Sequence, residues 1–232
     1  MRRAVARWVA ECLGFQDSLT SWVNAEKDMR NNLDVRSITV ERSNRSIIRE
    51  LSLGVANGSL IHLKGENGSG KTTLLRTIAG LIPPAEGEIF WNSSNIIHQE
   101  IFHPMLNFVS ENCGLANELT TFENLSFLQA FSKKTKHNTV EDALQKMNLS
   151  QTSNSYLSVL SAGQRQRVSL TQLLLFECPL WLLDEPFNSL DADTCKTVEG
   201  LIDAHVIKGG IAIVASHQSF QLATAQKTIE LL

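Results

Sequence analysis

The chain has 232 residues, 43% hydrophobic residues and a formal net charge of −3, which suits one α/β domain with a subdomain. The weakly acidic net charge and the absence of a basic stripe in the sequence argue against a nucleic-acid partner. No stretch approaches the roughly 20 apolar residues of a membrane-spanning helix. The four cysteines are scattered without metal-binding spacing, which indicates reduced thiols.

Residues 1–35 are expected to form an N-terminal extension. The opening "MRRAVARWVAECLGF" combines early arginines with helical apolar spacing, as in a mitochondrial presequence. Acidic residues recur up to residue 28, and such presequences are poor in acids. We therefore favour an ancillary helix or a disordered segment, or untranslated sequence if translation starts at Met29.

Short strands and one helix are expected next. Residues 36–48 ("RSITVERSNRSII") and 58–65 ("GSLIHLKG") alternate or run apolar between Gly and Asn, which predicts strands. Residues 70–81 ("GKTTLLRTIAGL") carry apolar residues at helical spacing as far as Leu81 and are followed by two prolines. The run "GEIFW" predicts another strand.

A phosphate-binding loop lies between the second of these strands and the helix. The stretch "GENGSGKTT" matches G-x-x-x-x-G-K-[ST], in which glycines let backbone N–H groups turn toward phosphate oxygens. Lys71 supplies charge for the β- and γ-phosphates, and Thr72 a hydroxyl for Mg²⁺. We expect ATP and Mg²⁺ as cofactors. The candidate nucleotide-binding residues are Gly65, Glu66, Asn67, Gly68, Ser69, Gly70, Lys71, Thr72 and Thr73.

The middle of the chain, residues 96–170, is predicted to be a helical subdomain. Thr120 with Glu123 and Thr139 with Asp142 have the spacing of capping boxes at helix starts.

The stretch "LSAGQRQRVSL" at 160–170 allows two compatible interpretations. Ser161 and Gln164 have capping-box spacing. The same helix start presents free N–H groups and a positive dipole end, which suit an anion, and Gly163 allows a close approach. The phosphate loop already binds the chain's own nucleotide, so a second phosphate site would bind a different nucleotide molecule.

Two apolar runs, "LWLLDEP" (180–186) and "IAIVASH" (211–217), are typical of strands buried on both faces of a parallel sheet. Asp184 is then delivered to the carboxyl edge of the sheet, where it can hold Mg²⁺. Glu185 is placed to orient and deprotonate a water in line with the γ-phosphate. His217, at the end of the second run, is expected to contact the γ-phosphate.

The order and spacing of "GENGSGKTT", "LSAGQ", "LLDEP", "SLD" (189–191) and "SH" resemble the ABC-type ATPase family over residues 36–232. The resemblance implies a P-loop NTPase fold, with a RecA-like α/β core sheet and an inserted helical subdomain. It also implies a head-to-tail homodimer in which Ser161, Gly163 and Gln164 contact the ATP of the second copy. Without the long coiled coil of DNA-repair members or a second cassette, neither DNA repair nor translation is favoured.

The stretches "GEIFW", "LTTFENLSF", "LSAGQRQRVSL", "LWLLDEPF" and "GGIAIVASHQ" most resemble, within this family, the ATP-binding subunits of haem exporters in cytochrome c maturation. That likeness implies an ATP-hydrolysing, energy-coupling subunit with integral-membrane partners, peripheral on the cytoplasmic face of the inner membrane. In an organelle this would be the matrix face of the inner mitochondrial membrane. The alternatives are the ATPase of another small exporter and a soluble iron–sulfur assembly ATPase.

The chain departs from the family pattern at two places. Family members commonly place an aromatic ring near the first strand to stack on adenine, but the segment "ITVERSNRSII" has none, which leaves an apolar group such as Val40 or Ile47. Asn112 stands where the family commonly has a glutamine that reaches Mg²⁺, so Asn112 is a further candidate metal ligand. Its amide is one methylene shorter, and we expect the ATPase to be slow alone.

Overall fold

The structure is a computed structural model that describes residues 31–42, 45–98, 102, 105–110, 114–132, 138–218, 220 and 222–231. The chain divides into two units, Met1–Asn31 and Asn32–Leu232. Residues 1–30, most of the expected extension, lie outside the described residues. The first strand, β1, begins at Asn32, four residues before the expected start of the ATPase domain at 36.

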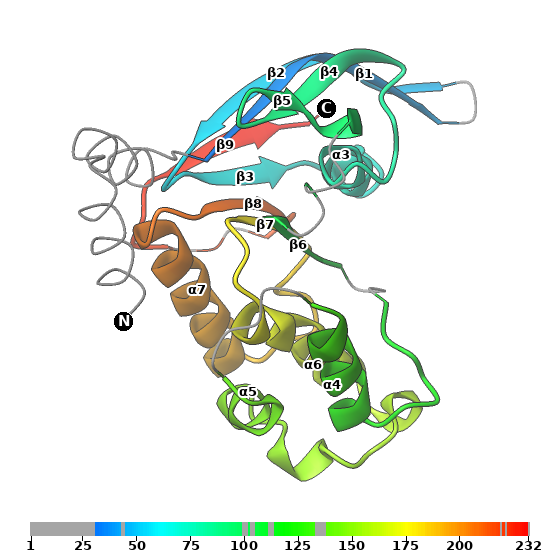
Figure 1. Ribbon diagram of the computed structural model, residues 1–232, viewed down its shortest axis with the longest axis vertical. Coiled ribbons are helices and arrows are strands. Elements are labelled where there is room, and N and C mark those ends of the chain that lie inside the picture. Colours follow the sequence, from blue (N-terminus) through cyan, green and yellow to red (C-terminus); the bar gives the residue numbers. More distant parts are fainter. Residues whose placement is uncertain are drawn as a thin grey trace, which may run out of the picture. The chain divides into compact units, whose positions relative to one another are not determined.

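An antiparallel sheet with strand order β2-β1-β4-β5 forms one layer of the second unit (Figure 1). It contains β1 (Asn32–Arg42), β2 (Arg45–Ala56), β4 (Glu86–Trp91) and β5 (Ser94–Asn95). The predicted strand over residues 36–48 is two strands, because Arg42 of β1 pairs with Arg45 of β2. The segment predicted as one strand therefore contains a hairpin connection.

The core is a parallel sheet with strand order β6-β7-β8-β3-β9. Its strands are β3 (Leu60–Lys64), β6 (Leu106–Val109), β7 (Leu180–Asp184), β8 (Ile211–Ala215) and β9 (Gln226–Glu230). Every residue of β7 and β8 is buried, which confirms the prediction from the two apolar runs. Burial on both faces removes the polar alternation that a half-exposed strand would show.

Helices cover both faces of this core sheet. The helix α3 (Lys71–Ile78) and the antiparallel sheet pack on one face through Leu74, Leu75 and Ile78. The helices α6 (Ala162–Leu175) and α7 (Ala192–Ile207) pack on the other face, where Val168 and Ile202 are fully buried. Both faces of the core sheet are therefore shielded from water, and a ligand can reach the sheet at its carboxyl edge.

Helix α3 ends at Ile78, so the prediction that it reaches Leu81 is wrong. Gly80 has φ 74°, and its N–H donates to Thr77 while that of Leu81 donates to Arg76. These bonds form a Schellman motif, which satisfies carbonyls at the end of a helix and stops it. Leu81 lies beyond the helix and is 57% exposed.

The helical region contains α4 (Thr121–Phe131), α5 (Val140–Lys146), and the short 3-10 turns η3 (Ser150–Thr152) and η4 (Leu157–Val159). Capping boxes open α4 at Thr120 and α5 at Thr139, as predicted. A further 3-10 turn, η1 (Ile96–His98), and β6 precede these helices, and β6 belongs to the core sheet. The range 96–170 therefore includes a core strand.

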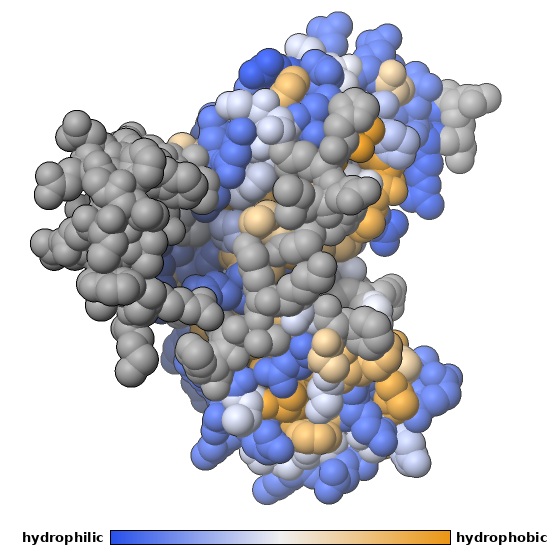
Figure 2. Space-filling view, in the orientation of Figure 1, coloured by the Kyte–Doolittle hydropathy of each residue, from blue (hydrophilic) through white to orange (hydrophobic). Residues whose placement is uncertain are grey.

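Figure 2 shows hydrophobic surface over the helical region among hydrophilic residues. Large exposed apolar side chains of this region are Phe127, Tyr156 and Val159. Over the described part of the chain, no helix combines the length and apolarity that a bilayer crossing requires.

Candidate active site

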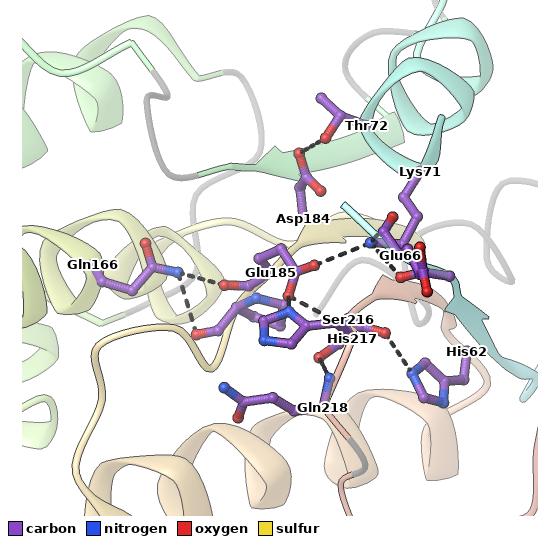
Figure 3. Close-up of polar contacts among 12 residues, drawn as sticks. His62, Glu66, Lys71, Thr72, Gln166, Asp184, Glu185, Ser216, His217 and Gln218 are labelled. Atoms are coloured by element: carbon purple, nitrogen blue, oxygen red, sulfur yellow. Dashed lines mark hydrogen bonds and ion pairs between the residues drawn. The ribbon is translucent and has the colours of Figure 1, made fainter. Parts of the chain in front are cut away.

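The three predicted site segments meet at the carboxyl edge of the core sheet. The phosphate loop follows β3, Asp184 ends β7, and Ser216 and His217 follow β8. Asp184 is paired with Ala215 in the sheet register, and Leu63 of β3 is paired with the same residue. Neighbouring parallel strands thus bring distant parts of the sequence to one place, as Figure 3 shows.

The phosphate loop is shaped by glycine conformations and by its lysine. Gly68 and Gly70 have φ values of 91° and 97°, which residues with a Cβ rarely adopt. The Lys71 ammonium is buried and donates hydrogen bonds to the carbonyls of Gly65 at 2.7 Å and Glu66 at 3.1 Å. Its charge therefore lies inside the loop, where the sequence predicted a phosphate contact.

Asp184 and Thr72 form the candidate metal position. The Thr72 hydroxyl donates to Asp184 Oδ2 at 2.7 Å, and the second oxygen, Oδ1, is buried without a hydrogen bond. Burial raises the pKa of the Asp184 carboxyl, and the nearby Glu185 carboxylate raises it further, against the opposing effect of the Thr72 hydrogen bond. A buried carboxylate oxygen without a donor is suited to a cation.

Glu185 is held between two cationic or donor groups (Figure 3). Its Oε1 lies 3.4 Å from the Lys71 ammonium, and its Oε2 lies 2.9 Å from His217 Nδ1. The backbone N–H of His217 also donates to Oε2, at 3.4 Å. The structure thus brings Glu185 and His217 into direct contact.

The predicted anion site at the start of α6 is a complete capping box. Ser161 Oγ accepts from the Gln164 N–H, and Gln164 Oε1 accepts from the Ser161 N–H. Gly163 lets the Ser189 backbone of the same chain approach α6 closely, since a Cβ on Gly163 would lie 2.4 Å from the Ser189 carbonyl oxygen. No hydrogen bond or ion pair between described residues joins Ser161 or Gln164 to the phosphate loop.

Two buried residues at the site were missed by the sequence analysis. The Gln166 amide donates to the carbonyls of Glu185 at 3.3 Å and Pro186 at 3.2 Å. His62 Nε2 lies 3.1 Å from the Ser216 carbonyl oxygen, in a cluster with the Phe220 ring. For His62 the available signal was a polar residue inside the apolar strand β3, and for Gln166 a polar residue on the buried side of α6, but neither signal identifies the partner.

The remaining predicted site residues are two candidate adenine contacts and one further candidate metal ligand. Val40 is fully buried in the core, so it is not available to contact a base. Ile47 lies beside the phosphate loop, with its Cγ2 2.6 Å from where a Cβ on Gly70 would be. Asn112 lies outside the described residues.

A parallel core sheet, a phosphate loop followed by a helix, and a strand-end carboxylate pair define a P-loop nucleoside triphosphatase. The model of the ABC transporter family matches residues 48–188, and the chain belongs to this family. It is a nucleotide-binding ATP hydrolase of the ABC type.

Two similar curated proteins carry the same name. The chain is 40% identical over 187 residues to the cytochrome c biogenesis ATP-binding export protein CcmA of Aliivibrio fischeri, covering 80% of this chain and 92% of that protein. It is 36% identical over 200 residues to the protein of that name from Haemophilus influenzae, covering 85% and 94%.

Solved structures of the same fold are also similar. The chain matches an ATP-binding subunit of an ABC transporter at 26% identity with a TM-score of 0.69, covering 80% of this chain and 79% of that one. A dimeric bacterial ABC transporter cassette, 23% identical, matches with a TM-score of 0.74 and covers 86% and 94%, which shows the fold.

Proposed function

We propose that the chain hydrolyses ATP with Glu185 as the general base. The observation that carries this role is the position of the Glu185 carboxylate between Lys71 and His217. Its Oε1 is buried beside the Lys71 ammonium and accepts no hydrogen bond, so it would take a proton from a water once Lys71 turns to the phosphates, while His217 holds Oε2. The water oxygen forms the new bond to the γ-phosphorus. The β–γ bridging oxygen leaves with the electron pair of the broken bond, on ADP.

The triphosphate would lie in the loop Gly65–Thr73, where Lys71 exchanges its carbonyl contacts for phosphate oxygens. This loop comprises Gly65, Glu66, Asn67, Gly68, Ser69, Gly70, Lys71, Thr72 and Thr73. His217, which already orients Glu185, would also reach the γ-phosphate. We infer both roles from the positions of these side chains at one sheet edge.

Mg²⁺ fits the pair Thr72 and Asp184. The orphaned, buried Oδ1 of Asp184 supports this assignment, and Asn112 is retained as a further proposed ligand. Among the described residues no group of three or more His, Cys, Asp or Glu could hold a metal. This agrees with an ion that arrives with the nucleotide, since Mg²⁺ usually combines few protein ligands with phosphates and water. The bound ion would neutralise charge on the β- and γ-phosphates.

A second copy would complete the site. Ser161, Gly163 and Gln164 open a helix of 14 residues, whose N-terminus is suited to the γ-phosphate of a partner's ATP. We propose a head-to-tail homodimer of ATPase domains spanning residues 36–232, each with a helical subdomain within about 96–170, apart from the core strand β6. Residues 1–35 remain a proposed extension.

We further propose that the chain is the energy-coupling subunit of a membrane complex for c-type cytochrome biogenesis. This complex would export haem or release it from a haem chaperone. The support is 36–40% identity to proteins named CcmA. Integral-membrane subunits would supply the pathway, and the exposed Phe127, Tyr156 and Val159 offer apolar surface for a protein partner. The chain would then be peripheral on the cytoplasmic face of the inner membrane.

Deletion of the gene followed by staining for covalently bound haem tests the specific assignment. We expect c-type cytochromes to be lost and to return with the wild-type gene, but not with Glu185→Gln. Normal c-type cytochromes in the deletion strain would contradict the assignment and leave the ATPase role intact. Co-purification with soluble rather than multi-span membrane proteins would instead favour the iron–sulfur assembly type.

The ATPase mechanism has its own test. Glu185→Gln should lower kcat by about 10²- to 10⁴-fold, the usual effect of losing a general base. The same variant should accumulate as an ATP-bound dimer in size-exclusion chromatography. Turnover at the wild-type rate would exclude Glu185 as the base.

A further inference from the structure

The backbone of Glu185 has a conformation that needs support. Its φ is 48°, in the left-handed region that residues other than glycine rarely adopt. Such a conformation costs of the order of 1–3 kcal/mol and persists where the surroundings impose it. The Glu185 N–H donates to the Ala215 carbonyl at 2.8 Å, and the Asn188 N–H donates to the Glu185 carbonyl at 3.2 Å.

Gln166 supplies the remaining support from a different element. Its amide nitrogen projects from α6 and bridges the carbonyls of Glu185 and Pro186 at 3.3 and 3.2 Å (Figure 3). One NH₂ group has two hydrogens, so both bonds form at once. The bridge spans the peptide unit directly after the Glu185 Cα and thus restrains the direction of its side chain.

The amide of Gln166 is a poor choice for packing alone. The side chain is 4% exposed, and its Oε1 is buried without a hydrogen bond. An unsatisfied buried acceptor costs about 1–3 kcal/mol, which an apolar residue of the same length would avoid. Retention of this acceptor is explained if the donor on the same amide is needed.

We propose that Gln166 is a positioning residue that couples the start of α6 to the general base. Gln166 lies little more than one helical turn after Ser161, and a helix transmits displacement along its axis as a rigid body. A shift of the α6 N-terminus on contact with a second nucleotide therefore moves the Gln166 amide, and with it the Glu185 peptide. This inference rests on the proposed roles of Glu185 and Ser161.

The test compares Gln166→Met with Gln172→Met in the full chain, together with its membrane partners if turnover needs them. Met keeps the length of the side chain and removes the donor, and Gln172 is a buried glutamine further along the same helix. We expect Gln166→Met to lower kcat by about 10- to 100-fold, the scale of a displaced catalytic group. The KM for Mg-ATP, the affinity for a fluorescent ATP analogue and the melting temperature should stay near the wild-type values. Gln172→Met should retain kcat.

Gln166→Glu gives a second measurement that a structural role would not reproduce. A carboxylate accepts hydrogen bonds, and a protonated carboxyl donates one. The kcat of Gln166→Glu relative to Gln166→Met should therefore rise as the pH falls, and a constant ratio would overturn the proposal. Unchanged kcat in Gln166→Met, or a joint loss of ATP binding and melting temperature, would do the same. If Glu185→Gln is inactive while Gln166→Met is fully active, this inference fails and the proposed function stands.

Discussion

The ammonium of Lys71 lies 3.4 Å from Oε1 of Glu185, and the two side chains are only 6% and 16% exposed. The residue that would bind the triphosphate is thus paired with the residue that would activate the water. Because Lys71 also donates to two loop carbonyls, it must leave established contacts to reach a phosphate. Nucleotide affinity and the charge of Glu185 are therefore linked.

This pairing predicts that Glu185→Gln binds ATP more tightly than the wild type. The neutral amide no longer holds Lys71 back and no longer repels the γ-phosphate, so we expect an affinity several-fold higher, worth about 1 kcal/mol. Equilibrium titration with a fluorescent ATP analogue measures this change. Lys71→Ala is the control and should bind weakly. Equal affinity of Glu185→Gln and the wild type would show that the ion pair does not oppose binding.

Gly163→Ala should lower the stability of the fold. The new methyl carbon would lie 2.4 Å from the Ser189 carbonyl oxygen, a backbone atom that cannot swing aside. We expect a loss of about 1–3 kcal/mol in the free energy of unfolding, as for other overpacked sites, measured by urea denaturation. The matched control is Gly200→Ala in α7, where nothing lies within 4 Å of the added Cβ. It should gain about 0.5–1 kcal/mol, because glycine weakens a helix. A fully stable Gly163→Ala would contradict the close approach.

Asp184→Asn should stabilise the fold and should reduce the additional stabilisation that Mg-ATP gives. Burial raises the pKa of Asp184, so its charged form destabilises the fold once the pH rises above the unfolded pKa. Asn removes that charge, and we expect a melting temperature roughly 2–4 °C higher at neutral pH, equivalent to about 1 kcal/mol. The difference should shrink as the pH falls and Asp184 becomes protonated. Added Mg-ATP should raise the melting temperature of the wild type much more than that of this variant.

Asp203 should make stability depend on pH in the opposite direction. Slight burial acts to raise its pKa, but hydrogen bonds from the Ala223 and Thr224 N–H groups and the Thr224 hydroxyl outweigh this and lower it. The stabilisation is therefore present above the pKa of the unfolded state and is lost as the pH falls through the lower pKa of the folded state. Melting curves across the acid range should show a larger loss for wild type than for Asp203→Asn. The exposed Asp193 offers the control, Asp193→Asn, which should follow the wild type.

Local features of the fold were predictable because neighbouring residues produce them. The capping boxes at Thr120, Thr139 and Ser161 each join residues three apart. Burial of β7 and β8 follows from two uninterrupted apolar runs. The hairpin between β1 and β2 was missed because the polar residues 41–46, which contain the turn, were included in one strand. The end of α3 was misplaced because Leu81 keeps the helical period past Gly80.

The sequence by itself determined the phosphate loop, the helix caps and the strand-end carboxylates, since each depends on residues close together in the chain. The tertiary structure decided which of them meet. Thr72 and Asp184 are 112 positions apart, and only the parallel register of the core sheet places their side chains in contact. The same register brings Glu185 to Lys71 and His217, and the packing of α6 under the sheet brings Gln166 to the Glu185 carbonyl. Contacts of this kind depend on strand order and on how helices pack on the sheet, and the spacing of residues along the chain specifies neither.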